Sequence, residues 1–172
     1  TQKKRHGDES PEAAMALGRL AQVLEDRGDL AGAEQLHRAA LAMRRKLGRD
    51  KHPETATILH NLALVLRKRA DLAGAEVLHR ESLAIWRESM GDEHPQLVTG
   101  LTNLACVLFE QSDLAGAEAC QREALALHVK LHGEEDPDVA KQISSLATIL
   151  SVRGDLASAE QSFRKALALR QR

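Results

Sequence analysis

The chain has 172 residues and a formal net charge of −1, with 24 basic and 25 acidic residues. This balance argues against a nucleic-acid interface or an electrostatic membrane contact, and no apolar run is long enough to span a bilayer. Hydrophobic residues make up 43% of the chain, mostly Ala and Leu, and aromatic residues only 2%, which favours packed helices over strands.

A 42-residue period organises the sequence. It separates the four prolines and four recurring aspartates, namely Pro11, Pro53, Pro95 and Pro137, and Asp29, Asp71, Asp113 and Asp155. A period of this length is typical of solenoid repeats built from one supersecondary unit. We expect an all-α solenoid of antiparallel helix pairs, with four repeats and about eight helices. The predicted order is a tail and linker over residues 1–9, then repeats over 10–51, 52–93, 94–135 and 136–172.

The second repeat shows the pattern that we expect in each of the four. Pro53 suits the first position of a helix, and Leu59, Leu62, Ala63 and Leu66 then recur at helical spacing. Small residues precede the aspartate in every repeat, as a tight helix–helix turn requires. The aspartate is a good N-cap for the second helix, which is predicted to end near Met90 and Gly91. Recurring alanines mark positions where paired helices approach closely.

These columns resemble the tetratricopeptide repeat. Its small positions fall on Ala21, Ala33 and Ala40, and its large apolar positions on Leu17, Leu20, Leu24 and Leu30. The 42-residue form, with the stretches HPETATILHNLALVL and DPDVAKQISSLATIL, is similar to the kinesin light chain class. The resemblance covers essentially the whole chain. It implies a right-handed solenoid that acts as a protein-interaction scaffold, holding a peptide or partner segment in a concave groove formed by the first helices.

Carried over position by position, the resemblance implies a groove that varies from repeat to repeat. The groove residues expected to contact a partner are Arg19, His60, Asn61, Leu64, Arg67, Lys68, Thr102, Asn103, Cys106, Phe109 and Lys141. Asn61 and Asn103 are the sharpest candidates, because an amide both donates to and accepts from a peptide main chain. Alternatively, either amide bonds the neighbouring helix. Phe109 either anchors an apolar side chain or packs on the next repeat.

Metal, cofactor and catalytic sites are not expected. His128 and His132 are spaced i, i+4 and could share a metal, but the sequence offers no third ligand. His37 and His79 occupy one column on the packing side of the second helix, which favours interior positions. Cys106 and Cys120 are interpreted as small apolar substitutes, and the chain lacks phosphate loops and nucleophile motifs. We therefore expect no enzyme activity, and a cytoplasmic, reducing environment is the simpler setting for these cysteines.

Two other roles remain open at this point. The chain could be an architectural segment that associates end to end through uncapped terminal repeats, because solenoids usually need capped ends. It could also be a sensor or regulatory part of a larger signalling protein. The repeat period extends to both ends of the chain, so we expect the chain to be a segment of a longer array.

Overall fold

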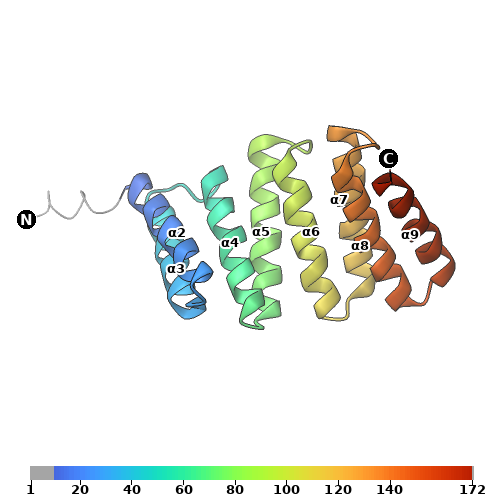
Figure 1. Ribbon diagram of the computed structural model, residues 1–172. Helices are drawn as coiled ribbons and strands as arrows, with labels where there is room; N and C mark the ends of the chain where they lie inside the picture. The colour runs from blue at the N-terminus through green and yellow to red at the C-terminus, as the bar shows by residue number, and fades with distance from the viewer. Residues whose placement is uncertain (1–9, 172) are drawn as a thin grey trace, which may run out of the picture. The chain divides into compact units, whose positions relative to one another are not determined.

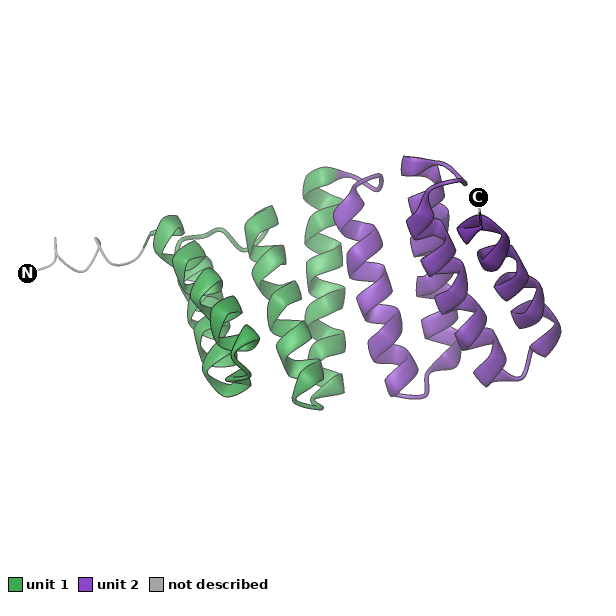
Figure 2. Ribbon diagram, in the orientation of Figure 1, with its two compact units in different colours: residues 1–90 green, residues 91–172 purple. Residues whose placement is uncertain are grey.

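The computed structural model describes residues 10–171, which form eight α-helices (Figure 1). The chain divides into two compact units, residues 1–90 and 91–172 (Figure 2). Unit 1 contains α2 (Pro11–Asp26), α3 (Leu30–Lys46), α4 (Pro53–Lys68) and α5 (Leu72–Met90). Unit 2 contains α6 (Pro95–Glu110), α7 (Leu114–His132), α8 (Pro137–Arg153) and α9 (Leu156–Arg170). The all-α class built from helix pairs is confirmed.

The helix order gives two helix pairs to each unit. In unit 1 the pairs are α2 with α3 and α4 with α5, and α3 also packs on α4. In unit 2 the pairs are α6 with α7 and α8 with α9, and α7 packs on α8. The expected repeat boundaries and the single continuous solenoid stay predictions, and the predicted tail over residues 1–9 lies outside the described residues.

Each first helix begins at its proline, and the residue before that proline caps it. Ser10 Oγ accepts from the Ala13 backbone N–H at 3.1 Å, and Asp136 Oδ1 accepts from the Asp138 N–H at 2.8 Å. In the middle repeats the acceptor is a histidine: His52 Nδ1 accepts from the Glu54 N–H at 3.2 Å. His94 Nδ1 accepts in the same way at 3.3 Å. These two histidines therefore cap the first helices of the middle repeats.

Each second helix begins at its aspartate, as predicted. The Asp71 carboxylate accepts from the Gly74 N–H at 2.9 Å, and the other three repeats make the same bond. The residue before each aspartate adopts a left-handed backbone conformation. It is glycine in the outer repeats, but Ala70 has φ of 64° and Ser112 has φ of 67°. A side chain at such a position is strained, because its Cβ crowds the backbone.

The predicted alanine columns form the centre of each helix pair. Ala21 and Ala33 are fully buried, and they form one apolar cluster with Val65 of the following helix. The corresponding alanines of the other pairs, Ala63, Ala75, Ala105, Ala117, Ala147 and Ala159, are at most 3% exposed. Methyl side chains allow close approach of the helix backbones, so larger residues here would overpack the pair.

Buried rings fill unit 1 beside these alanines. His79 is fully buried, and its ring centroid lies 5.0 Å from that of His60, which lies 5.4 Å from that of Trp86. Both ring nitrogens of His79 lack a hydrogen-bond partner. Burial lowers the pKa of His79 to about 3, helped by the charges of His60 and Arg67, and burial lowers the pKa of His60 to about 4.

His37, the counterpart of His79 in the first repeat, is also fully buried, so the predicted interior position of both histidines is confirmed. Burial lowers the pKa of His37, although the Glu25 carboxylate opposes this shift. The same column holds Gln121 in the third repeat, where its amide donates to the Gln142 carbonyl oxygen at 3.2 Å.

Ala70→Gly is expected to stabilise the protein by about 0.5–1 kcal/mol, because glycine accepts the left-handed conformation without a Cβ clash. Ala84→Gly is the matched control, since Ala84 is exposed inside α5. There the same substitution is expected to destabilise by about 1 kcal/mol. Urea unfolding followed by circular dichroism measures both changes. Equal effects of the two substitutions would contradict the strain at Ala70.

The buried histidines predict a loss of stability in acid. Their pKa values are lower in the folded than in the unfolded chain, so unfolding takes up protons below about pH 6.5. Stability should be constant above that pH and should fall as the pH drops toward 4. The slope is about 1.4 kcal/mol per pH unit for each histidine that must be protonated.

Urea titrations between about pH 7.5 and about pH 4.5 measure this slope. The fluorescence of Trp86, the protein's only tryptophan, reports on unit 1 directly. His79→Gln, which introduces the residue that the third repeat carries as Gln121, should flatten the slope. His132→Gln, at a position outside the buried cluster, should leave it unchanged. An unchanged slope in His79→Gln would mean that other groups cause the acid sensitivity.

Candidate functional site

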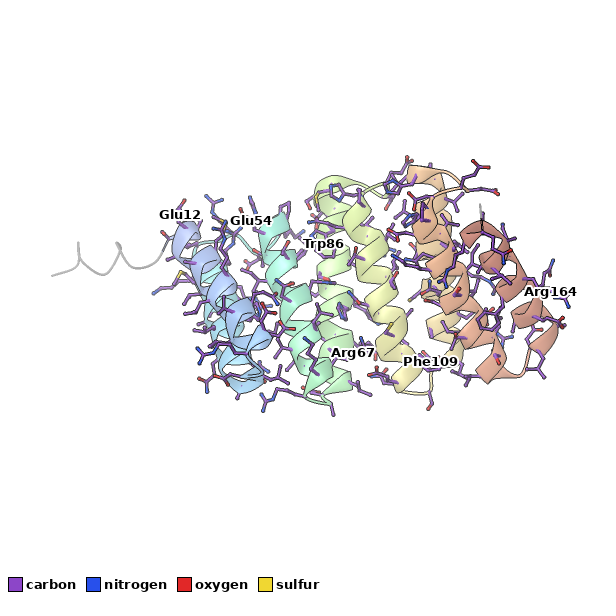
Figure 3. All side chains as sticks on the ribbon, in the orientation of Figure 1. Glu12, Glu54, Arg67, Trp86, Phe109 and Arg164 are labelled. Atoms are coloured by element: carbon purple, nitrogen blue, oxygen red, sulfur yellow. The ribbon has the colours of Figure 1, made fainter. Side chains whose placement is uncertain are left out.

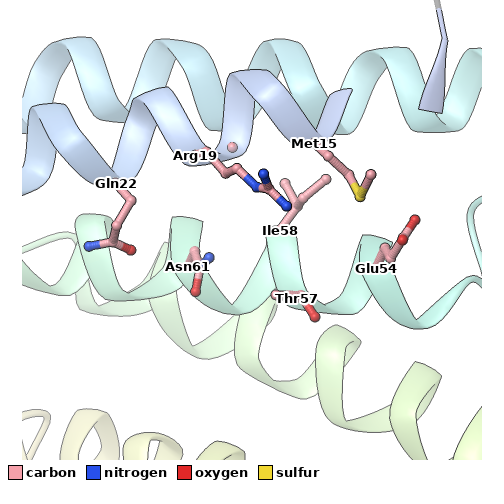
Figure 4. Close-up of a pocket in the computed structure, with 8 residues that line it drawn as sticks. Met15, Arg19, Gln22, Glu54, Thr57, Ile58 and Asn61 are labelled. Atoms are coloured by element: carbon pink, nitrogen blue, oxygen red, sulfur yellow. The ribbon is translucent and has the colours of Figure 1, made fainter. Parts of the chain in front are cut away.

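A furrow runs between the two first helices of unit 1 and has a volume of about 320 Å³. Figure 4 shows side chains of α2 and α4 extending into the space between these helices. Four residues of each helix line it: Met15, Gly18, Arg19 and Gln22 from α2, and Glu54, Thr57, Ile58 and Asn61 from α4. On each helix the lining residues follow the spacing i, i+3, i+4 and i+7, which places them on one face.

The apolar part of this furrow comes from Met15 and Ile58, and Gly18 widens it. A Cβ at Gly18 would meet no atom within 4 Å, so this position leaves open space beside the other lining residues. The first repeat is the only one of the four with a glycine in this column, where the others have His60, Thr102 and Ser144. The furrow therefore offers apolar contact and room for a ligand side chain.

Two polar side chains of the furrow are unengaged. Within residues 10–171, the Arg19 guanidinium makes no ion pair and the Asn61 amide makes no hydrogen bond. By contrast, the Gln22 amide donates to Glu25 at 3.3 Å and to Asp26 at 3.4 Å. The Glu54 carboxylate accepts from Arg44 at 2.5 Å. Arg19 and Asn61 are thus the groups in this furrow that are available to a ligand.

Unit 2 has a second furrow in the same position between its first helices, again of about 320 Å³. It is lined by Val98, Thr99, Thr102 and Asn103 of α6, by Asp138, Lys141 and Gln142 of α8, and by His128 of α7. Figure 3 shows the side chains on these helices. The recurrence of one furrow in both units follows from the repeat, because equivalent columns face equivalent neighbours.

The polar groups of this second furrow are more engaged with one another. Thr102 Oγ1 lies 3.2 Å from Gln142 Oε1, and Lys141 pairs with Asp138 at 2.5 Å. His128 Nε2 lies 3.1 Å from Asp136 Oδ1. A ligand here would have to compete with these contacts, so the two furrows differ in chemistry although they share a position.

The furrows bring together five of the predicted groove residues: Arg19 and Asn61 in unit 1, and Thr102, Asn103 and Lys141 in unit 2. The lining of neither furrow includes His60, Leu64, Arg67, Lys68, Cys106 or Phe109, whose proposed role stays a prediction. His60 is 7% exposed. Lys68 is exposed, and its ammonium pairs with the buried Glu25 at 2.5 Å.

Sequence reasoning missed several lining residues, including Glu54, Ile58, Asp138 and Gln142. They lie on α4 and α8, the first helices that follow α2 and α6 in the repeat order. The signal was available in principle, because Glu54 and Asp138 share one repeat column and Ile58 and Gln142 another. What the sequence could not give was the helix stagger that sets these columns opposite the preceding helix.

The histidines and cysteines show no metal-binding arrangement in the described part of the chain. No group of three or more His, Cys, Asp or Glu between residues 10 and 171 is placed to hold a metal ion. His128 and His132 do lie together, with ring centroids 4.8 Å apart. Cys106 and Cys120 are not joined in a disulfide. Between residues 10 and 171, every helix is too short or too polar to cross a bilayer.

The comparisons agree with this architecture. The tetratricopeptide repeat model matches three overlapping stretches, residues 12–88, 54–128 and 101–172. No curated protein matches the sequence. Among solved structures, BtubC (BKLC) from P. vanneervenii is 24% identical, with a TM-score of 0.89, and the match covers 94% of this chain and 65% of that chain. This chain thus spans less than two thirds of the BtubC chain.

A second similar structure contains the nearly identical TPR-like repeats ascribed to a kinesin light chain of Podosopora anserina. It is 21% identical, with a TM-score of 0.83, over 94% of this chain and 77% of that chain. At these identities the likeness concerns the fold. The family model covers most of the chain, so the chain belongs to the tetratricopeptide repeat family, with the fold of its kinesin light chain-like class; repeats of this family generally mediate protein–protein interactions and are typically non-enzymatic scaffolds.

Proposed function

We propose that this chain is a protein-interaction module that binds a peptide or a partner segment along the first helices of its repeats. The observation that carries the proposal is the recurrence of one furrow, between α2 and α4 and again between α6 and α8. A volume of about 320 Å³ suits a few residues of a peptide, and ligand sites combine apolar lining with a few polar groups.

The chemistry of the unit 1 furrow supports a peptide ligand. Met15 and Ile58 provide apolar contact, while Asn61 has an unengaged amide that can donate to a main-chain carbonyl and accept from a main-chain N–H. Arg19 adds donors for a carbonyl or carboxylate oxygen. An extended peptide presents these groups at regular intervals, so the main chain supplies affinity and its side chains supply specificity.

The variable columns support the same proposal. The column of Asn61 holds Arg19, Asn103 and Ser145 in the other repeats, although the neighbouring Leu-Ala columns are constant. A scaffold that reads successive segments of one partner needs this combination of fixed packing and varied surface. In this proposal the chain has no catalytic role of its own. Its setting is a reducing, cytoplasmic compartment, where cysteines outside disulfides are common.

The expected result of Asn61→Ala is about a tenfold loss of affinity for a peptide selected from an array, since about two hydrogen bonds are lost. Asn103→Ala tests the second furrow in the same way. Isothermal titration calorimetry with the selected peptide measures both. Gln35→Ala is the matched control, because Gln35 is an exposed amide on α3, away from the furrow lining.

The double variant Asn61→Ala, Asn103→Ala sharpens this test. If it binds the selected peptide as tightly as the unmodified chain, the furrows are not the binding surface. If Gln35→Ala lost as much affinity as the double variant, the peptide would bind on the second helices instead. Circular dichroism of each variant checks that the helices are retained.

A further inference from the structure

The helix α4 connects the unit 1 furrow to a cluster of buried rings. Four of its side chains, Asn61 among them, form one wall of the furrow (Figure 4). His60, the residue before Asn61, turns instead toward α5, where its ring lies 5.0 Å from that of His79 and 5.4 Å from that of Trp86. A movement of α4 away from α5 would therefore also displace half of the furrow lining.

This cluster has no place for a positive charge. His79 is fully buried, and neither of its ring nitrogens has a hydrogen-bond partner within residues 10–171. The charged groups that act on it, His60 and Arg67 of α4, are both basic. A proton on the His79 ring would therefore be a buried charge without water, a hydrogen bond or an anion beside it, which is strongly unfavourable in a protein interior.

His37 on α3 adds a third buried histidine to unit 1. It is fully buried, and neither ring nitrogen has a partner in the described part of the chain. Burial lowers its pKa, although the Glu25 carboxylate of α2 opposes the shift. Glu25 also pairs with Lys68 of α4 at 2.5 Å, and this ammonium offsets part of its effect on His37. The buried histidines of the described chain, His37, His60 and His79, thus all belong to unit 1.

Unit 2 carries other residues in the same columns. The counterpart of His79 is Gln121, whose amide stays neutral at every pH, and the counterpart of His60 is Thr102. His128 of α7 differs from the histidines of unit 1 because its Nε2 lies 3.1 Å from the Asp136 carboxylate. A proton on His128 gains an ion pair, whereas a proton on His79 gains none.

The remaining described histidines do not set the two units apart. His52 caps α4 in unit 1 and His94 caps α6 in unit 2, each by accepting a backbone N–H, so their titration acts on both units alike. His132 is exposed, so water solvates its charge. A difference between the units in acid therefore comes from the buried histidines.

We propose that the α4–α5 pair is an acid-sensitive switch: protonation of its buried histidines separates α4 from α5 and opens the unit 1 furrow, while unit 2 keeps its fold. Opening of the helix pair does not depend on any ligand. Release of a bound peptide by this opening rests on the proposed function, because a peptide that binds only the closed furrow also holds α4 in place.

The size of the effect follows from proton uptake. Burial lowers the pKa of His79 to about 3 and that of His60 to about 4, against about 6.5 for an exposed histidine. Because both pKa values are lower in the closed form, stability is complete above about pH 6.5 and is lost as the pH falls below it. Between about pH 7.5 and about pH 5, each histidine raises the opening constant about thirtyfold, and the two together raise it about a thousandfold.

Hydrogen–deuterium exchange of the 172-residue chain, read by mass spectrometry at about pH 7.5 and about pH 5, tests the switch. After correction for intrinsic exchange rates, protection in α4 and α5 is expected to fall about a thousandfold, and protection in α8 and α9 by less than about tenfold. The fluorescence of Trp86 follows the opening in parallel. Equal losses in both units would show global acid unfolding and overturn the proposal, as would unchanged protection in α4 and α5.

Two substitutions test whether the buried rings cause the opening. His79→Gln places the neutral residue of the third repeat in this column, so the loss of protection in α4 and α5 should shrink to about thirtyfold. His60→Gln should have the same effect, and it provides the test if His79→Gln folds poorly at neutral pH. His132→Gln is the matched control and should leave the full loss, because His132 is exposed. A full loss in both cluster variants would rule out the histidine cluster as the switch.

Calorimetric titration with the array-selected peptide separates the switch from the proposed function. If no peptide binds at about pH 7.5, the proposed function is wrong, whereas the exchange result stands. If a peptide binds there through Asn61, its affinity should fall at about pH 5, and His79→Gln should reduce this fall by up to about thirtyfold. Titration of the peptide itself affects both chains equally. The same fall in both chains would overturn acid release from the furrow.

Discussion

The close approach of paired helices at fully buried alanines is the constraint on which the rest of the structure depends. Ala21 and Ala33 lie in one cluster with Val65, so the closely packed helices α2 and α3 also form the surface on which α4 packs. A side chain larger than methyl would separate α2 from α3 and shift the surface on which α4 packs. Because the repeat copies the alanines, it also copies the distance and stagger between helices, and the furrows take their position from that stagger.

Buried charges then fix the joints between repeats. Arg44 is fully buried on α3, where its guanidinium binds Glu54 at 2.5 Å and Thr55 at 3.2 Å at the start of α4. Glu118 of unit 2 is also nearly buried, with its side chain 4% exposed between Arg122 and Arg153. Such pairs add little net stability, since desolvation offsets attraction, but a shifted register would leave a buried charge unpaired. These ion pairs therefore favour one register between successive helix pairs, although they add little to the stability of the fold.

The proposed binding surface consists of positions that helix packing leaves free to vary among the repeats. The Leu-Ala columns that pack helix against helix are the same in all four repeats, whereas the furrow columns vary in charge and size, from Arg19 and Asn61 in unit 1 to Lys141 in unit 2.

The helices, the aspartate caps of the second helices and the alanine columns could all be predicted from the amino-acid pattern, because each depends on residues within one 42-residue period. Pro53, Asp71 and Ala63 each act through neighbours a few positions away or through the paired helix. Tertiary packing, by contrast, sets which residues face each other across successive repeats. Ile58 joins the furrow opposite Arg19, His60 turns inward toward Trp86, and Lys68 pairs with Glu25 across 43 positions of sequence. These contacts depend on the stagger of one helix pair on the next, a quantity that side-chain packing sets and that no local pattern encodes.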